Sequence, residues 1–222
     1  MPYNATLLMS EFVTHDVKRF IVTKPDIFTY TPGQGTELVI NLPGWREREG
    51  RPFTPTSLAE DQVLEFTIKR YPGHHGVTDR LHTLPPGTGL LLTKAFGTIT
   101  YQGPGLFIAA GAGLTPFLSI LRNLAASGKA AENALLYSNK TRADIICEKE
   151  LRHTFGERAL FTLTREENPA YRQGRIDKAL IEQSLDASRP YAYVCGPDEF
   201  VEQIKGTLAE LGATAEYVVF EK

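Results

Sequence analysis

The sequence predicts a two-domain protein of the β + α/β class: an antiparallel β-barrel followed by an α/β domain with a five-stranded parallel sheet. The first half consists of short β-branched and apolar segments between Gly- and Pro-containing turns, which is typical of a closed antiparallel barrel. In the second half strands alternate with helices, which is typical of a parallel, doubly wound sheet. The pattern changes at GPG (103–105), so we expect domains over residues 1–102 and 103–222.

In the first half, the strand-forming segments end at turns such as TPGQG (31–35). One short helix is expected over residues 78–84, because PPG (85–87) ends it. The expected strands cover residues 5–16, 17–25, 36–42, 51–57 and 63–71, with two more short strands within residues 87–103.

In the second half, each apolar strand except the last is followed by a helix-forming segment. The first helix is expected to have Thr115 as its N-cap, Pro116 as its first helical residue and Gly128 as its stop. The expected strands cover residues 105–110, 133–138, 159–164, 191–196 and 215–220. The expected helices cover residues 115–128, 147–155, 174–185 and 198–212.

Composition narrows the possible functions. The chain is 42% hydrophobic and 23% charged, as in an ordinary globular protein, and its net charge of −2 gives nucleic-acid binding no support. No apolar run approaches the ~20 residues of a membrane helix, and the start does not resemble a secretory signal. The two cysteines, Cys147 and Cys195, have no metal-binding spacing. We therefore expect no metal site, no resident iron–sulfur cluster and a reducing, cytoplasmic location.

The segment GAGLTP (111–116) follows a predicted strand and opens a predicted helix. Glycines at such a turn let a pyrophosphate approach the backbone, and the helix N-terminus offers free N–H groups and a positive dipole end. This strand–turn–helix context is the one that a dinucleotide site requires, although a tight turn without a ligand fits the residues too. The acidic residue expected ~20 residues further on for NAD is absent, because the next strand ends in SNKTR (138–142).

Three further segments carry residues suited to a cofactor. In RPFTPTS (51–57), Arg51 could pair with a phosphate, Phe53 could stack on a planar ring and Thr54 could hydrogen-bond a ring nitrogen, although an ordinary edge strand fits as well. GHHGVT (73–78) precedes the short helix and offers a second phosphate cradle or a solvated loop. CGPD (195–198) follows a strand at the ligand-binding edge of the sheet, where Cys195 either contacts the ligand or simply packs.

Taken in order, PGQ (32–34), RPFTPTS, GVT (76–78), GAGLTP and CGPDEF (195–200) resemble the motifs of the ferredoxin–NADP reductase superfamily. The resemblance covers almost the whole chain and implies an FAD-binding barrel followed by an NAD(P)-binding domain. It also implies an oxidoreductase in which NAD(P)H passes a hydride to FAD, and an external carrier such as ferredoxin or flavodoxin accepts the electrons. The flavin residues that it implies are Arg51, Pro52, Phe53, Thr54, Gly76, Val77 and Thr78. The nucleotide residues that it implies are Gly111, Gly113, Thr115, Pro116, Arg165, Cys195, Gly196 and Pro197.

The resemblance places Thr54, Cys195 and Phe220 closest to the chemistry. Phe53 stands where the family's flavin motif usually has tyrosine; Phe220 stands for a terminal tyrosine, and Val218 occupies the position of a glutamate. TRE (164–166) is similar to the segment that reads the 2′-phosphate, which favours NADPH over NADH. Two alternatives stay open: a reductase of free flavin, and a non-catalytic nucleotide-sensing subunit.

Overall fold

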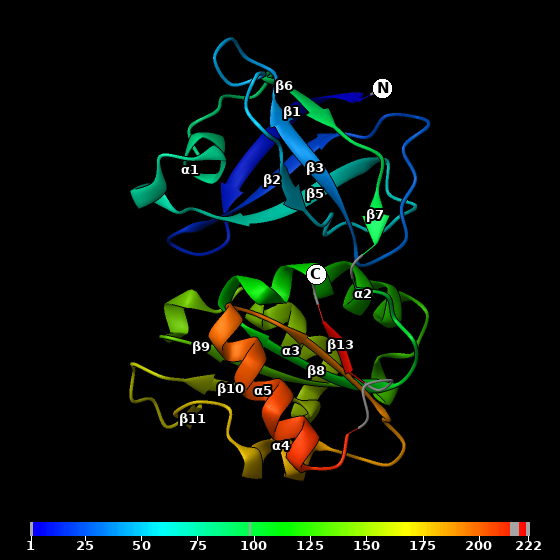
Figure 1. Ribbon diagram of the computed structural model, residues 1–222, viewed down its shortest axis with the longest axis vertical. Coiled ribbons are helices and arrows are strands. Elements are labelled where there is room, and N and C mark those ends of the chain that lie inside the picture. The colour runs from blue at the N-terminus through cyan, green and yellow to red at the C-terminus, as the bar shows by residue number, and fades with distance from the viewer. Residues whose placement is uncertain (1, 98, 214–217, 221–222) are drawn as a thin grey trace.

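The computed structural model describes residues 2–97, 99–213 and 218–220 and has two domains, one above the other in Figure 1. The N-terminal strands are β1 (Tyr3–Phe12), β2 (Val17–Thr23), β3 (Gln34–Ile40), β4 (Arg51–Phe53), β5 (Val63–Lys69), β6 (Gly89–Leu92) and β7 (Phe96–Gly97). They pair antiparallel in the order β4-β3-β6-β1-β2-β5, with β7 beside β3. The Thr56 N–H donates to the Glu65 carbonyl at 2.6 Å, so the segment after β4 meets β5 and nearly closes the barrel. The expected antiparallel barrel is confirmed.

The interior of the barrel is filled by apolar side chains from every long strand. Leu7, Phe20, Leu38, Phe66 and Leu92 are all buried in one continuous cluster. Each such side chain stabilises the fold by ~1.5–3 kcal/mol relative to its exposed state. This core is separate from the clusters that pack on the C-terminal sheet.

Two elements of the barrel are shorter than the sequence predicts. Strand β4 ends at Phe53 instead of residue 57, since Pro55 has no N–H to donate to a ladder. Helix α1 (Val77–Leu81) begins one residue before the expected start and ends three residues before the expected end. Its continuation is a tighter turn, in which the Leu84 N–H donates to the Leu81 carbonyl at 3.2 Å.

The C-terminal domain is a parallel sheet covered by helices on both faces. The strands are β8 (Gly105–Ala110), β9 (Ala134–Asn139), β10 (Ala159–Leu163), β11 (Arg172–Gln173), β12 (Tyr191–Cys195) and β13 (Val218–Phe220), in the order β11-β10-β9-β8-β12-β13. Helices α2 (Thr115–Ala126) and α3 (Glu148–Phe155) pack on one face, and α4 (Lys178–Ser184) and α5 (Asp198–Glu210) on the other. The five predicted strands are confirmed, and the two-residue β11 adds a sixth at the edge.

Helix α2 begins differently from the prediction. Thr115 is not the N-cap, because the 3₁₀ turn Gly111–Leu114 runs directly into the helix and leaves Leu114 at the cap, with no side-chain capping bond. Pro116 was expected as the first helical residue but is the second, a position in the first turn where it needs no hydrogen-bond donor. Gly128 follows the helix with φ +73°, a conformation that glycine adopts without strain.

Tyr193 anchors the segment that joins the two domains. Its hydroxyl donates to the Gly103 carbonyl at 2.7 Å and accepts from the Gln102 and Gly103 N–H groups, each at 3.0 Å. Its ring stacks on Phe107 with the centroids 4.5 Å apart. We propose 1–102 and 103–222 as the two domains on this basis. Over the described residues, every helix is too short or too polar to span a bilayer.

Candidate active site between the two domains

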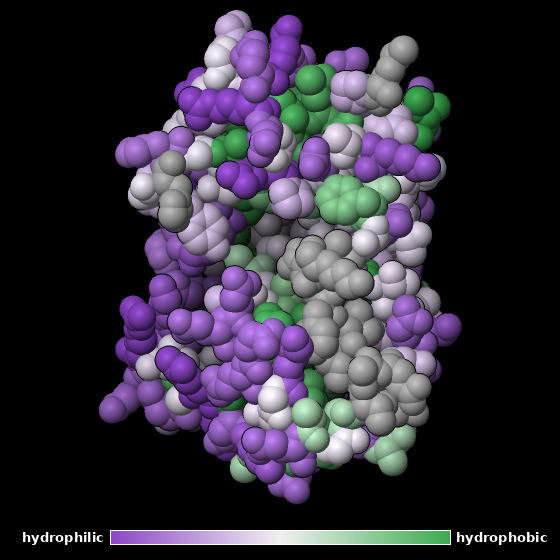
Figure 2. Space-filling view, viewed as in Figure 1, coloured by the Kyte–Doolittle hydropathy of each residue, from purple (hydrophilic) through white to green (hydrophobic). Residues whose placement is uncertain are grey.

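A cleft of about 630 Å³ lies between the barrel and the C-terminal sheet. Its walls are the segment after β4, the end of β5, the turn that follows β8 and the carboxyl ends of β9 and β12. The surface is hollowed between the two domains on the face shown in Figure 2. Carboxyl ends of parallel strands are the usual ligand-binding edge of an open α/β sheet.

The turn that follows β8 is shaped for close approach of backbone and ligand. Gly111 has φ +53°, and open space lies where its side chain would be. A Cβ on Gly113 would collide with the Cys195 carbonyl and lie 2.7 Å from the Gly196 Cα, so this turn packs directly against the end of β12. The turn is a 3₁₀ helix that runs into the twelve-residue α2, so the positive dipole end of this continuous helical segment borders the cleft.

Tyr137 fixes the turn after β8 through a hydrogen bond. It was not identified from the sequence as a residue of the site. Its ring is fully buried in the core, and its hydroxyl donates to the Gly111 carbonyl at 2.9 Å. Burial raises the pKa of the Tyr137 hydroxyl, so it remains a donor at neutral pH. An apolar strand that contains one tyrosine carries no local signal for such a long-range contact.

The barrel contributes the other wall of the cleft. Pro52, Phe53 and Thr54 all line it, with Phe53 half-buried and Thr54 9% exposed. Strict alternation along a strand would put Phe53 and Thr54 on opposite faces, but β4 ends at Phe53. Both residues line one cavity.

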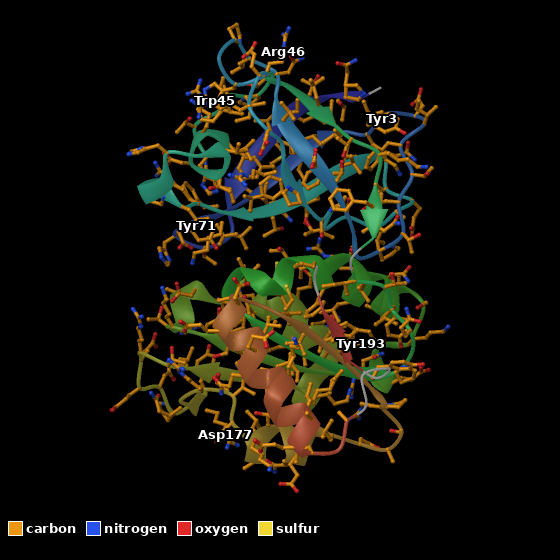
Figure 3. All side chains as sticks on the ribbon, viewed as in Figure 1. Tyr3, Trp45, Arg46, Tyr71, Asp177 and Tyr193 are labelled. Atoms are coloured by element: carbon orange, nitrogen blue, oxygen red, sulfur yellow. The ribbon has the colours of Figure 1, made fainter. Side chains whose placement is uncertain are left out.

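The barrel wall of the cleft also includes a lysine at the end of β5 and a tyrosine two residues after it. Lys69 and Tyr71 line the cleft, and Tyr71 is labelled in Figure 3 at the edge of the barrel that faces the C-terminal domain. The Lys69 ammonium lies 2.8 Å from the Asp16 carboxylate. Burial alone would raise the pKa of Asp16, but its hydrogen bond to Lys69 and the lysine charge leave that pKa lowered. Neither Lys69 nor Tyr71 was identified from the sequence as a residue of the site.

At the end of β12, the segment CGP places backbone and a thiol at the cleft. Cys195 is 2% exposed, and it lines the cleft together with Gly196 and Pro197. A Cβ on Gly196 would lie 2.6 Å from the Phe200 ring, so this ring of α5 packs directly over the glycine. The structure thus brings Cys195 to the same cavity as Thr54 and the turn after β8.

The remaining expected residues lie outside the lining of this cleft. Arg51 is exposed on β4, and the short α1 carries Gly76, Val77 and Thr78 elsewhere on the barrel. Arg165 is also exposed, while its neighbour Thr164 does line the cleft.

The cleft continues into a smaller cavity of about 190 Å³. Ser138, Thr164 and Pro197 border both spaces, and Arg175 borders the smaller one. Arg165, which the sequence favoured, is not among its lining residues. Arg175 therefore brings a cation to this end of the cleft, in addition to Lys140, which lines the cleft itself.

Phe220 is described only through its backbone. Strand β13 pairs in parallel with β12, with Phe220 opposite Val194. Its side chain lies outside the part that the structure describes, so its expected position over a flavin stays a prediction.

Comparison with known proteins agrees with this geometry. The family model of the oxidoreductase NAD-binding domain matches residues 107–206. The chain is 27% identical to the ferredoxin–NAD(P)(+) reductase component of the naphthalene 1,2-dioxygenase system of Pseudomonas putida, over 96% of this chain and 66% of that protein. It is 28% identical to ferredoxin–NADP reductase B of Sorangium cellulosum, over 100% of this chain and 97% of that protein. Over its whole length the chain is similar to members of the ferredoxin–NADP reductase superfamily.

Solved structures share the superfamily fold over the whole chain. The CS-b5R domains of human Ncb5or, in an NAD⁺ form, match with a TM-score of 0.85 and 26% identity, covering 100% of this chain and 70% of that one. The ferredoxin NADP⁺ reductase of Neisseria gonorrhoeae, with bound FAD and NADP, matches with a TM-score of 0.82 and 22% identity, covering 99% and 98%. Among curated relatives, the chain spans 66%, 58% and 50% of the length of the dioxygenase reductase, a propane 2-monooxygenase reductase component and a mycobacterial NADPH oxidoreductase.

Proposed function

We propose that this protein is an NAD(P)H-dependent flavoprotein reductase that uses FAD and passes electrons to an external carrier. One observation carries the proposal: a single cleft brings together the segment after β4, the turn after β8 and the CGP segment after β12. These are the three places where the sequence carries residues suited to a planar ring, a pyrophosphate and a nicotinamide. A solely structural fold would not require all three at one cavity.

The barrel wall fits a flavin. The half-buried Phe53 ring offers a face on which a planar ring system can stack, and the Thr54 hydroxyl is available to hydrogen-bond a ring nitrogen. Arg51 is exposed, so its guanidinium is free to pair with a phosphate on the barrel surface. The backbone of residues 76–78 is proposed as the second phosphate contact.

The sheet wall fits a nicotinamide nucleotide. Open space at Gly111, together with the N-terminus of α2, offers N–H groups to a pyrophosphate, and Thr115 and Pro116 line the same space. Cys195, Gly196 and Pro197 are proposed to support the nicotinamide ring, and Phe220 to cover the flavin face before the nucleotide enters. Thr164, with Arg165 or Arg175, is proposed to meet the 2′-phosphate, which favours NADPH.

The protein's own contribution is binding and orientation. A bound flavin supplies the redox chemistry, since it accepts a hydride and releases electrons singly. Thr54 would hold the ring through a hydrogen bond to one of its nitrogens. Cys195 is small and polarisable, so it can touch the nicotinamide without a large desolvation cost.

Ferredoxin or flavodoxin is the proposed acceptor. Support comes from the names of two relatives, one the reductase component of a dioxygenase system and the other a ferredoxin–NADP reductase. A cytoplasmic location is also proposed, because neither Cys147 nor Cys195 is in a disulfide.

Absorbance of the purified chain tests the proposal. After desalting, the protein should retain an oxidised flavin spectrum, or regain it when titrated with FAD in preference to FMN. With NADPH or NADH it should then reduce an artificial dye acceptor. Flavin that is lost on desalting but turned over as a free substrate would favour the free flavin reductase. Nucleotide binding without any dye reduction would favour the sensing subunit.

A further inference from the structure

Arg122 is a single side chain that joins the two walls of the cleft. It lies on α2, the helix that begins at the turn after β8, and it points across the domain interface into the barrel. Its Nη1 donates to the Thr56 carbonyl and to Glu65 Oε1, each at 2.6 Å. Thr56 follows Thr54 by two residues, and Glu65 lies on β5.

The other edge of the guanidinium is fixed by its own domain. Its Nε and Nη2 donate to the two carboxylate oxygens of Glu150, on α3, at 2.6 and 2.9 Å. Burial would raise the pKa of Glu150, but the hydrogen bonds and charge of Arg122 leave it lowered, so the carboxylate is ionised at neutral pH. The planar fork is thus held on both edges, a geometry that lysine cannot reproduce.

The barrel segment that Arg122 contacts has little freedom of its own. Thr56 is fully buried; its N–H donates to the Glu65 carbonyl at 2.6 Å and its hydroxyl to Glu65 Oε1 at 2.7 Å. Any movement of Arg122 is therefore transmitted to residues 54–56, and any movement of α2 is transmitted to the turn after β8. The Arg122 side chain is only 19% exposed, so solvent screens these contacts weakly.

We propose that Arg122 is a positioning residue that sets the separation between the barrel wall of the cleft (residues 52–54) and its sheet wall (residues 111–116 and 195–197). The inference rests on the proposed function, because it assigns those walls to FAD and NAD(P)H. Hydride transfer needs the reacting atoms ~3–3.5 Å apart, and a 1 Å misplacement can cost ~100-fold in rate. Arg122 touches neither reacting group. It acts through Thr56 on one side and through α2 on the other.

A second contact across the interface supplies a matched control. Ser119 lies on α2 less than one helical turn before Arg122, is fully buried, and accepts from the Gly33 N–H at 3.1 Å. Gly33 lies in the turn before β3, and neither Gly33 nor Ser119 lines the cleft. Ser119→Ala therefore removes a contact between barrel and helix but keeps every contact of Arg122 to Thr56 and Glu65.

The test compares Arg122→Gln, Arg122→Lys and Ser119→Ala in the full chain loaded with FAD. The readouts are flavin content, nucleotide Kd and single-turnover flavin reduction by NADPH and by NADH. Arg122→Gln should keep its flavin and its nucleotide Kd within ~3-fold while the reduction rate falls by ~10- to 100-fold. Arg122→Lys should recover part of the rate, and the deuterium isotope effect should rise in both. Ser119→Ala should stay within ~3-fold of wild type.

A wild-type reduction rate in Arg122→Gln would overturn the inference, as would a rate loss that only follows lost flavin. If Arg122→Gln fails to fold, Glu150→Gln decides the matter, because it keeps Arg122 and its barrel contacts but weakens the hold on the outer edge of the guanidinium. A slower rate with unchanged flavin content then supports the inference, and an unchanged rate overturns it. If wild-type protein itself shows no flavin reduction by either nucleotide, the proposed function has failed instead.

Discussion

Cys195 is buried against the turn that follows β8, so its role depends on position more than on reactivity. Its backbone contacts the Gly113 position directly, and it borders the cleft that Thr54 borders from the other side. Replacing sulfur by oxygen in Cys195→Ser makes the contacting atom smaller and less polarisable. We expect flavin reduction at saturating NAD(P)H to slow by ~10- to 100-fold, with flavin content unchanged because the residue lies outside the barrel. A wild-type single-turnover rate would reduce Cys195 to a packing residue.

The choice between NADPH and NADH depends on which arginine meets the 2′-phosphate. The sequence favours Arg165, whereas Arg175 borders the smaller cavity that continues from the cleft. A lost hydrogen bond to a charged group costs ~1.5–3 kcal/mol, or about 10- to 150-fold in affinity. We expect Arg165→Ala to lower kcat/KM for NADPH by that factor and to leave NADH unchanged, with Arg175→Ala as the parallel variant. The assignment to Arg165 is wrong if only Arg175→Ala shows the selective loss, or if both nucleotides lose equally.

Some residues of the site could be recognised in the sequence, and others could not. The glycines of GAGLTP could be recognised, because a strand–turn–helix pattern requires them locally. Tyr137, Lys69 and Arg122 could not, since their roles come from partners that are 26, 53 and 28 or more positions away in the chain. Thr115 was expected as a cap because it precedes a helical pattern, but the 3₁₀ turn before it removed the need for one.

At the scale of elements, α1 is secured to the barrel by His82, the residue that follows it. His82 is buried; its Nε2 lies 2.9 Å from the Ile68 carbonyl, and Lys18 Nζ donates to the His82 carbonyl at 2.9 Å. Burial lowers the pKa of the imidazole, and the nearby charges of Lys18 and Arg70 act in the same direction. The hydrogen bond to the Ile68 carbonyl and the charge of Asp16 oppose this shift but do not cancel it. The folded protein therefore holds the ring neutral and as a donor to Ile68.

This arrangement predicts acid sensitivity of the barrel. Because the unfolded chain binds the proton more tightly, the stability from neutral His82 is complete above the ordinary histidine pKa of ~6.5 and falls as pH drops below it. We expect the free energy of unfolding to decrease from pH 7.5 to pH 5.5 more in wild type than in His82→Gln, measured by urea denaturation. Equal pH dependence in the two proteins would show that His82 does not titrate on unfolding.

The elements themselves were largely predictable, and their ends were not. Each predicted strand of the parallel sheet is present, because fully buried strands such as β8 and β9 are continuous apolar runs. Strand β11 was not predicted, because a strand of two residues is too short to show an alternation of apolar and polar side chains. Helix α4 begins at Lys178 rather than residue 174, since Asp177 caps it through a 2.8 Å hydrogen bond from the Leu180 N–H.

At the scale of the whole molecule, the site exists only where the two domains meet. The barrel has a core of its own, whereas the core beneath α2 and α3 also takes in Val17 and Ile99 from the first 102 residues. The chemistry proposed here additionally requires a fixed separation between the two domains. Tyr193 anchors the joining segment and Arg122 spans the interface, and both are held by hydrogen bonds to the backbone of the barrel half or the linker. The order of the motifs along the sequence could indicate that they share a site. It could not indicate which side chains set the distance between the two walls of that site.

Anaerobic mixing of the FAD-loaded chain with NADPH, and separately with NADH, tests the central claim most directly. If one cleft holds flavin and nicotinamide in contact, the visible absorption of oxidised flavin should disappear in a single turnover. The rate should fall when the transferred hydrogen is replaced by deuterium, because that bond breaks in the step. Binding of both flavin and nucleotide with no change in flavin absorption would contradict the account.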